Sequence, residues 1–119
     1  MYGEVTTVAG TGTFGEKDGY RLSCHLKNPY GIAANADGTQ IVFSSPLFRH
    51  LVRKIDPEGV VSLLAGNGMP GYRDGLRDWA KFNSPHALAL DPTGNVIVAD
   101  AGNNAIRAIT PEGYVYTIS

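Results

Sequence analysis

His86 is the first residue whose type and position could do chemistry. It follows Pro85 and opens the apolar run Ala87-Leu88-Ala89-Leu90. An imidazole can ligate a metal or carry a proton near neutral pH. A single histidine is not a ligand cluster, however, and Tyr30 occupies the matching place earlier in the chain. The residues alone therefore favour a hydrogen-bonded His86, and they predict no cofactor.

Two glycine-rich segments, 10–15 and 66–71, fit the pattern G-x-G-x-x-G. That pattern binds dinucleotides when a helix N-terminus within a βαβ unit points at the pyrophosphate. Neither segment precedes a long helical pattern, and Pro70 interrupts the second copy. We therefore interpret both segments as tight connectors.

Two other residue pairs recur at matching positions. Asp18-Gly19 returns as Asp74-Gly75, and Arg53 returns as Arg107. Aspartate before glycine commonly caps the backbone N–H groups of a turn. A repeated arginine favours a salt bridge or a stacked guanidinium between units over substrate binding. Repetition thus points to structural roles.

The remaining candidates are local. Cys24 and His25 are adjacent, so an extended backbone directs them to opposite sides and they do not form a nucleophile–base pair. Trp79 and Phe82 favour a core position under a long loop. The segment 47–51 combines apolar and basic residues, which could anchor a partner, although packing on a neighbouring unit is favoured.

These residues sit in a sequence that repeats itself. The two units coincide when Pro29 is laid on Pro85 and, with a slightly shorter offset, when Arg53 is laid on Arg107. The sequence of each unit predicts four short strands separated by Gly-bearing turns. The third strand is expected to be more exposed than the others, and a helical turn is expected only near 74–82. The predicted strands are residues 31–35, 40–43, 51–55 and 60–64, then 87–91, 96–99, 105–109 and 114–118.

Composition excludes several classes of protein. The 119 residues include 10 Lys and Arg against 11 Asp and Glu, for a net charge of -1. This net charge and a pI near 6.3 do not favour nucleic-acid binding. No apolar run could span a membrane. The start of the chain lacks the pattern of a secretory signal. The single cysteine cannot form a disulfide within the chain, which weakly favours a cytoplasmic location, but the sequence does not assign the compartment.

Residues 82–107 resemble the NHL repeat through Pro-His-Ala-Leu-Ala-Leu-Asp, Gly-Asn-Val-Ile-Val-Ala-Asp and Asn-Asn-Ala-Ile-Arg. The connector Val-x-x-x-Ala-Gly-x-Gly-x-x-Gly-x-x-Asp-Gly is similar to the long-loop variety of that family. The first unit departs at Ser44-Ser45, which replaces Ala-Asp, and across 46–50, which replaces the Gly-Asn-Asn loop. The resemblance implies an all-β fold of four-stranded β-propeller blades, two per chain.

The expected division is an outer strand and connector at 3–29, blade one at 30–65, a connector at 66–85 and blade two at 86–119. Residues 4–8 would form the outer strand, surplus to two blades. Two blades cannot close a ring, and family members usually have six. We therefore expect either self-association, with a trimer giving six blades favoured, or a fragment of a longer propeller.

The function expected first is a non-catalytic scaffold whose loops bind a macromolecule or peptide. The candidate binding face comprises Tyr30, Phe48, Arg49, His86, Asp100, Asn103 and Asn104. A second reading, by resemblance to peptidyl-hydroxyglycine amidating lyases or to lactonases, is a metal-dependent enzyme. Copies of His86 would then converge on a zinc ion. Calcium is the other metal that this second hypothesis allows, with no residues assigned to it. A third reading is an engineered or truncated fragment without activity.

Overall fold

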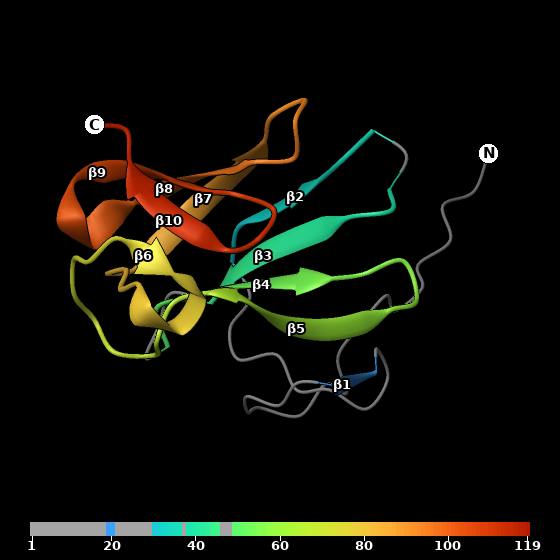
Figure 1. Cartoon of the computed structure of the whole chain (residues 1–119), viewed down its shortest axis with the longest axis horizontal. Helices are drawn as coiled ribbons and strands as arrows, with labels where there is room; N and C mark the ends of the chain where they lie inside the picture. Colours follow the sequence, from blue (N-terminus) through green and yellow to red (C-terminus); the bar gives the residue numbers. More distant parts are fainter. Residues whose placement is uncertain (1–18, 21–29, 37, 46–48) are drawn as a thin grey trace.

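The computed structural model describes residues 19–20, 30–36, 38–45 and 49–119. This part of the chain forms two five-stranded antiparallel sheets, which lie side by side (Figure 1). The first sheet has the order β1-β5-β4-β3-β2 and the second the order β6-β10-β9-β8-β7, so both are meanders with one added edge strand.

The first sheet comprises β1 (Gly19–Tyr20), β2 (Ile32–Ala34), β3 (Ile41–Ser45), β4 (Leu51–Ile55) and β5 (Val60–Ala65). The second comprises β6 (Gly75–Leu76), β7 (Pro85–Leu90), β8 (Val96–Asp100), β9 (Ala105–Ile109) and β10 (Tyr114–Thr117). Two short 3-10 helices, η1 (Arg77–Trp79) and η2 (Ala101–Asn103), lie between strands. The predicted all-β repeat is confirmed. Each sheet gains a fifth strand because the Asp-Gly connector pairs with the last strand of its unit.

The turns explain the strand boundaries. At the β7–β8 turn, the Asp91 carboxylate accepts hydrogen bonds from the backbone N–H groups of Thr93 and Asn95 at 3.0 and 2.8 Å. At the β2–β3 turn, the Asn35 side-chain oxygen likewise accepts a hydrogen bond from the Gln40 backbone N–H at 3.0 Å. Such side-chain acceptors replace ladder bonds that the turn interrupts.

The third strand of each unit is more buried than its alternating sequence predicts. On β4, Val52, Arg53 and Ile55 are all buried, and on β9 Ala105, Arg107, Ala108 and Ile109 are buried. The prediction of an exposed strand was wrong because it counted arginine as a surface residue. Hydrogen bonds and aromatic contacts hold Arg107 in the interior instead.

The connector 66–84 folds back on itself rather than opening a helix, and Arg107 of the second sheet donates hydrogen bonds to its Lys81 and Arg73 carbonyls. Gly66 N–H donates to the Arg77 carbonyl at 3.0 Å, and Gly71 N–H donates to that of Phe82, also at 3.0 Å. Only the three-residue η1 follows the glycines. Phe82 is fully buried as expected, whereas Trp79 is 60% exposed, so its expected core position was wrong. The guanidinium of Arg73 covers the Trp79 ring at 3.8 Å.

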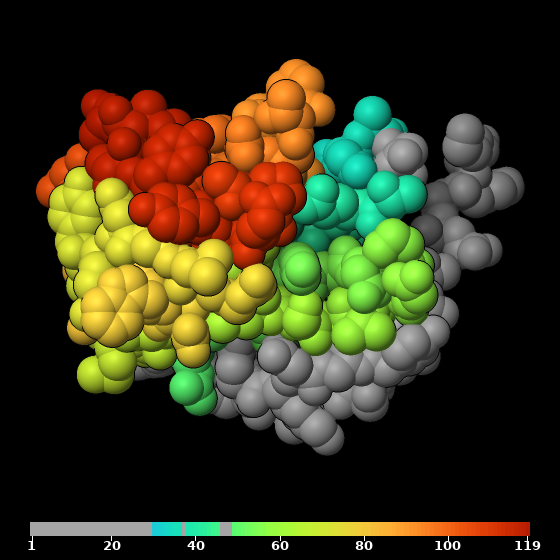
Figure 2. All heavy atoms as spheres, viewed as in Figure 1, coloured from blue at the N-terminus to red at the C-terminus, as the bar shows by residue number. Residues whose placement is uncertain are grey.

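The main core lies between the two units. The first sheet contributes Val42, Val52 and Leu64, and the second unit contributes Phe82, Val96, Val98, Ile109 and Val115. The space-filling view shows the yellow connector against both the red strands of the second sheet and the green strands of the first (Figure 2). One sheet and the next connector thus bury each other.

No helix in the described part of the chain is long and apolar enough to cross a membrane. The expected outer strand at 4–8, the first glycine-rich segment, Asp18, Cys24, His25 and Phe48 lie outside the described residues.

Candidate functional site

Tyr30 and His86 come together although they belong to different units of the repeat. Tyr30 precedes β2 and His86 lies at the start of β7, so equivalent positions of the two units become neighbours. The two rings stack with centroids 4.7 Å apart and planes 24° from parallel. The Tyr30 side chain is 72% exposed. The pair therefore presents an aromatic surface at the junction of the sheets.

The backbone beneath this pair is closely packed. Gly31 N–H donates to Ser44 Oγ at 2.8 Å, and Ser44 Oγ donates to the His86 carbonyl at 2.8 Å. A Cβ on Gly31 would lie only 1.9 Å from that carbonyl oxygen. Glycine is required here because the two inner strands approach each other too closely for any side chain. The stacked rings consequently rest on a fixed support.

Asp100 does not share the exposure of Tyr30. Its carboxylate is fully buried. Oδ1 accepts a hydrogen bond from Asn83 N–H at 2.8 Å, while Oδ2 accepts from Asn103 Nδ2 at 2.7 Å and Arg107 Nη1 at 2.6 Å. Asn104, at the end of the same loop, is exposed in a left-handed conformation with φ 51°. The loop thus turns Asp100 inward and leaves Asn104 at the surface.

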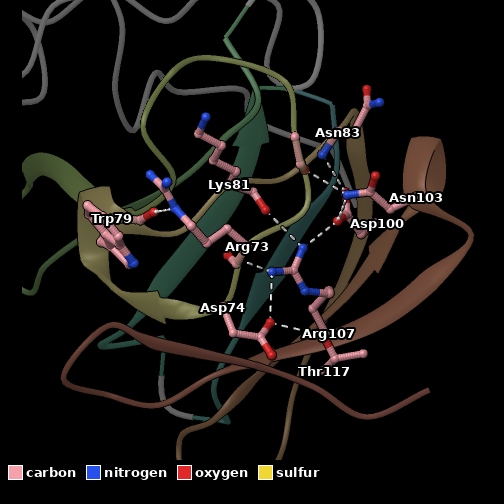
Figure 3. A network of polar contacts seen from close by, with 10 residues as sticks. Arg73, Asp74, Trp79, Lys81, Asn83, Asp100, Asn103, Arg107 and Thr117 are labelled. Atoms are coloured by element: carbon pink, nitrogen blue, oxygen red, sulfur yellow. Dashed lines mark hydrogen bonds and ion pairs between the residues drawn. The ribbon is translucent and has the colours of Figure 1, made fainter.

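Arg107 is the centre of the largest polar network in the described structure (Figure 3). It pairs with buried Asp100 at 2.6 Å and with Asp74 at 3.0 Å. Its guanidinium also donates to the backbone carbonyls of Lys81 and Arg73, each at 3.0 Å. Arg107 does form salt bridges, but within the second unit and not between the units as predicted. Asp74 binds Arg107 and Thr117 instead of capping its own turn.

The first unit has a different arrangement at the matching place. Ser45 pairs with Leu51 as Asp100 pairs with Ala105, so Ser45 stands where the second unit has its buried acid. Ser45 Oγ and Arg49 Nε are buried and lack hydrogen-bond partners. The Arg53 guanidinium lies 5.6 Å from the centre of the Phe43 ring. The Ser44-Ser45 departure in the sequence was the signal for this difference.

His50 also joins the two units. Its Nδ1 accepts a hydrogen bond from Ser84 N–H at 2.9 Å. Burial lowers the pKa of His50 from its ordinary value, and the nearby Asp100 carboxylate opposes this only in part. Since Nδ1 must be unprotonated to accept, the neutral ring is the form that stabilises the junction.

The described residues contain no group of three or more His, Cys, Asp or Glu side chains that could hold a metal. His86 has Tyr30 as its ring neighbour. A metal at His86 would need ligands from residues outside those described or from another chain.

The sequence comparisons agree with the repeat geometry. Residues 82–109 match the model of the family described as "NHL repeat". The chain belongs to the NHL-repeat family. This NHL-repeat chain is 35% identical over 98 residues to Protein SUPPRESSOR OF QUENCHING 1, chloroplastic, of Arabidopsis thaliana, covering 81% of this chain but 9% of that protein. It is also 29% identical over 101 residues to Teneurin-1 of Caenorhabditis elegans, covering 71% of this chain and 4% of that one.

Solved structures resemble the same chain. A protein of unknown function from Bacteroides thetaiotaomicron superposes with a TM-score of 0.76 at 28% identity, covering 84% of this chain and 26% of that one. An auxiliary nutrient binding protein from the same organism gives a TM-score of 0.73 at 25% identity, covering 94% and 28%. The NHL-repeat chain thus spans about a quarter of these solved chains and less than a tenth of the two curated relatives.

Proposed function

We propose that this chain is a two-blade segment of an NHL β-propeller and serves as a non-catalytic binding module. Two antiparallel meanders packed one after the other, with the connector of the second covering the first, are the arrangement of neighbouring blades. The resemblance to an auxiliary nutrient binding protein supports a binding role over a catalytic one.

The stacked Tyr30–His86 pair is the observation that carries the binding role. Tyrosine is enriched in binding surfaces because it gives large contact area with few rotatable bonds. Here the ring is mostly exposed and already held by a second ring and by a rigid backbone junction. A partner peptide with an aromatic or arginine side chain could stack on this pair with little loss of conformational entropy.

A random-peptide display library, panned against the purified protein, tests this role. Selected peptides should bind the parent protein and lose about tenfold or more in affinity to Tyr30→Ala, the magnitude of one interface anchor. Met69→Ala is the matched control because Met69 is a similarly exposed residue in the connector. Peptides that bind Tyr30→Ala as tightly as the parent would contradict the proposal.

We further propose that the second sheet associates with another copy of the chain. Val52 and Leu64 of the first sheet are buried against the second unit, at 0% and 1% exposure. Their counterparts in the second unit, Ile106 and Ile118, are 39% and 54% exposed. The backbone pairing is the same, since Ile106 bonds Ser119 as Val52 pairs with Ala65. The second sheet therefore repeats a contact face that nothing in the described chain covers.

Three chains joined head to tail would give six blades and leave no such face open. Light scattering should then report about three times the 12.7 kDa chain mass. Ile118→Asp should shift the protein to the monomer, whereas Met69→Asp should leave its mass unchanged. A chain that stays monomeric and unfolds cooperatively at every concentration would refute association without touching the peptide-binding test.

A further inference from the structure

His50 contacts the segment of the second unit that carries His86. It lies just before β4 of the first sheet, and its Nδ1 accepts a hydrogen bond from Ser84 N–H at 2.9 Å. Ser84 precedes His86 by two residues in the chain. A side chain of the first unit therefore bonds the backbone that leads into the ring on which Tyr30 stacks.

The backbone at His86 depends on the first unit for its position. The register of β7 against β8 shifts near the start of β7, so this stretch departs from the regular ladder. Ser44 Oγ donates to the His86 carbonyl at 2.8 Å, and the bond from Ser84 to His50 lies just before it in the chain. These two contacts hold the irregular stretch against the first sheet.

The backbone of Ser84 is strained. Its φ is 55°, in the left-handed region that residues other than glycine seldom adopt. Such a conformation persists only where the surrounding contacts hold it, and the His50 acceptor is one of these contacts. Because the peptide bonds on either side are planar, a rotation of residue 84 towards the extended conformation would displace Pro85 and His86.

Only the neutral form of His50 can make this contact. The imidazolium ion carries N–H groups on both ring nitrogens, so no orientation of the protonated ring offers an acceptor to Ser84 N–H. Burial lowers the pKa of His50 from its ordinary value of 6.5, and the Asp100 carboxylate opposes this only in part. The hydrogen bond should therefore be lost as the pH falls below 6.5.

The charged and titratable groups around His50 do not supply another acceptor for Ser84. Asp100, on β8, is fully buried and already pairs with Arg107 of β9. Arg49 adjoins His50 in the chain, and its guanidinium can only donate. The His86 ring follows Ser84 and is stacked on a tyrosine. Protonation of His50 therefore leaves Ser84 N–H without its acceptor.

We propose that His50 is a positioning residue for the Tyr30–His86 pair and makes this surface dependent on pH. While His50 is neutral, Ser84 is held and the two rings stack. Once His50 is protonated, Ser84 relaxes and His86 moves away from Tyr30. All of these contacts lie within one chain, so association with another copy does not replace them. The effect on a bound peptide rests on the proposed binding function, whereas the movement of the rings does not.

Two-dimensional NMR of the aromatic rings tests the movement, with the Tyr30 signals assigned through Tyr30→Phe. In the parent protein, the nuclear Overhauser contact between the Tyr30 and His86 rings should be present at about pH 7.5 and lost at about pH 5. His50→Asn should keep the contact at both pH values. Its Oδ1 takes the place of Nδ1 as acceptor, does not titrate, and asparagine tolerates the φ of 53°. His50→Ala should lack the contact at both pH values.

Asp91→Asn is the matched control, because it also exchanges a titratable residue for asparagine, beyond the far end of β7. It should show the same loss of contact as the parent. His86 keeps its own titration in His50→Asn, so a change caused by His86 alone would appear in that variant too. A contact that persists in the parent at low pH, or that is lost equally in His50→Asn, would overturn the proposal. His50→Asn decides the matter if His50→Ala does not fold.

Peptides selected on the parent protein extend the test to binding. They should bind the parent about tenfold more weakly at about pH 5 than at about pH 7.5, as expected when one anchor is lost. His50→Asn should show a clearly smaller change, and an equal change would count against His50. Failure to select any peptide that depends on Tyr30 would refute the binding function alone, because the ring contact is measured without a peptide.

Discussion

Replacing Asp100 with serine, the residue that the first unit has at the matching position, removes the buried acid of the Arg107 network. The change leaves Arg107 Nη1 with only the Lys81 carbonyl as acceptor. It also removes the two carboxylate oxygens of Asp100 that accept hydrogen bonds from Asn83 N–H and Asn103 Nδ2. Asp100 and Arg107 are both 0% exposed, so water cannot replace these bonds without opening the structure.

The expected loss of unfolding free energy is about 3 kcal/mol, because removing one partner of a buried ion pair costs about 3–5 kcal/mol. The lower end applies here because Arg107 keeps Asp74, whose side chain is 43% exposed. Removing Asp74 instead, by Asp74→Asn, should cost about 1 kcal/mol or less, since solvent screens that pair. For a chain of this size, the Asp100 loss lowers the melting temperature by roughly 10 °C.

Urea unfolding followed by circular dichroism measures both variants. Adding Arg107→Met to Asp100→Ser supplies the internal check, because it removes the buried charge that Asp100→Ser leaves unpaired. We expect the double variant to be no less stable than Asp100→Ser alone. Asp100→Ser losses below about 1 kcal/mol, or no greater than those of Asp74→Asn, would refute the claim that this buried pair holds the connector to the second sheet.

Three further predictions concern the junctions and turns. Gly31→Ala should lower the unfolding free energy by about 1–3 kcal/mol in the same assay, because its Cβ would collide with the His86 carbonyl at 1.9 Å; an unchanged midpoint would contradict this close approach. Stability should fall as the pH drops from about 7 to about 5, since the unfolded chain protonates His50 before the folded chain does. His50→Asn, which suits the left-handed φ of 53°, should flatten that pH profile, and an identical profile would count against His50. Asp91→Ala should lower the midpoint of urea unfolding by removing the acceptor of its turn, and an unchanged midpoint would show that the turn forms without it.

The repeat explains why so much of the fold could be predicted. Glycine and proline at regular positions mark the turns, and strands 51–55 and 105–109 have the predicted bounds. The short strands β1 and β6 were missed because two residues carry no periodic pattern, and they form only by pairing with β5 and β10. Trp79 was misplaced because a large apolar side chain suggests a core position, whereas a cation–π contact with Arg73 stabilises it at the surface.

The sequence by itself determined the number of units, the turn positions and the hydrophobic runs, because these depend on local backbone preferences and on periods of a few residues. Only the tertiary structure decided which polar residues are buried and what they contact. It directed Asp100 inward to Arg107 and left Ser45 Oγ and Arg49 Nε without hydrogen-bond partners at the equivalent place. It also stacked Tyr30 of the first unit on His86 of the second. Such contacts depend on how the strands and the sheets pack together. The Ser44-Ser45 departure indicated that the two units differ here, but it did not specify the contacts that each side chain makes.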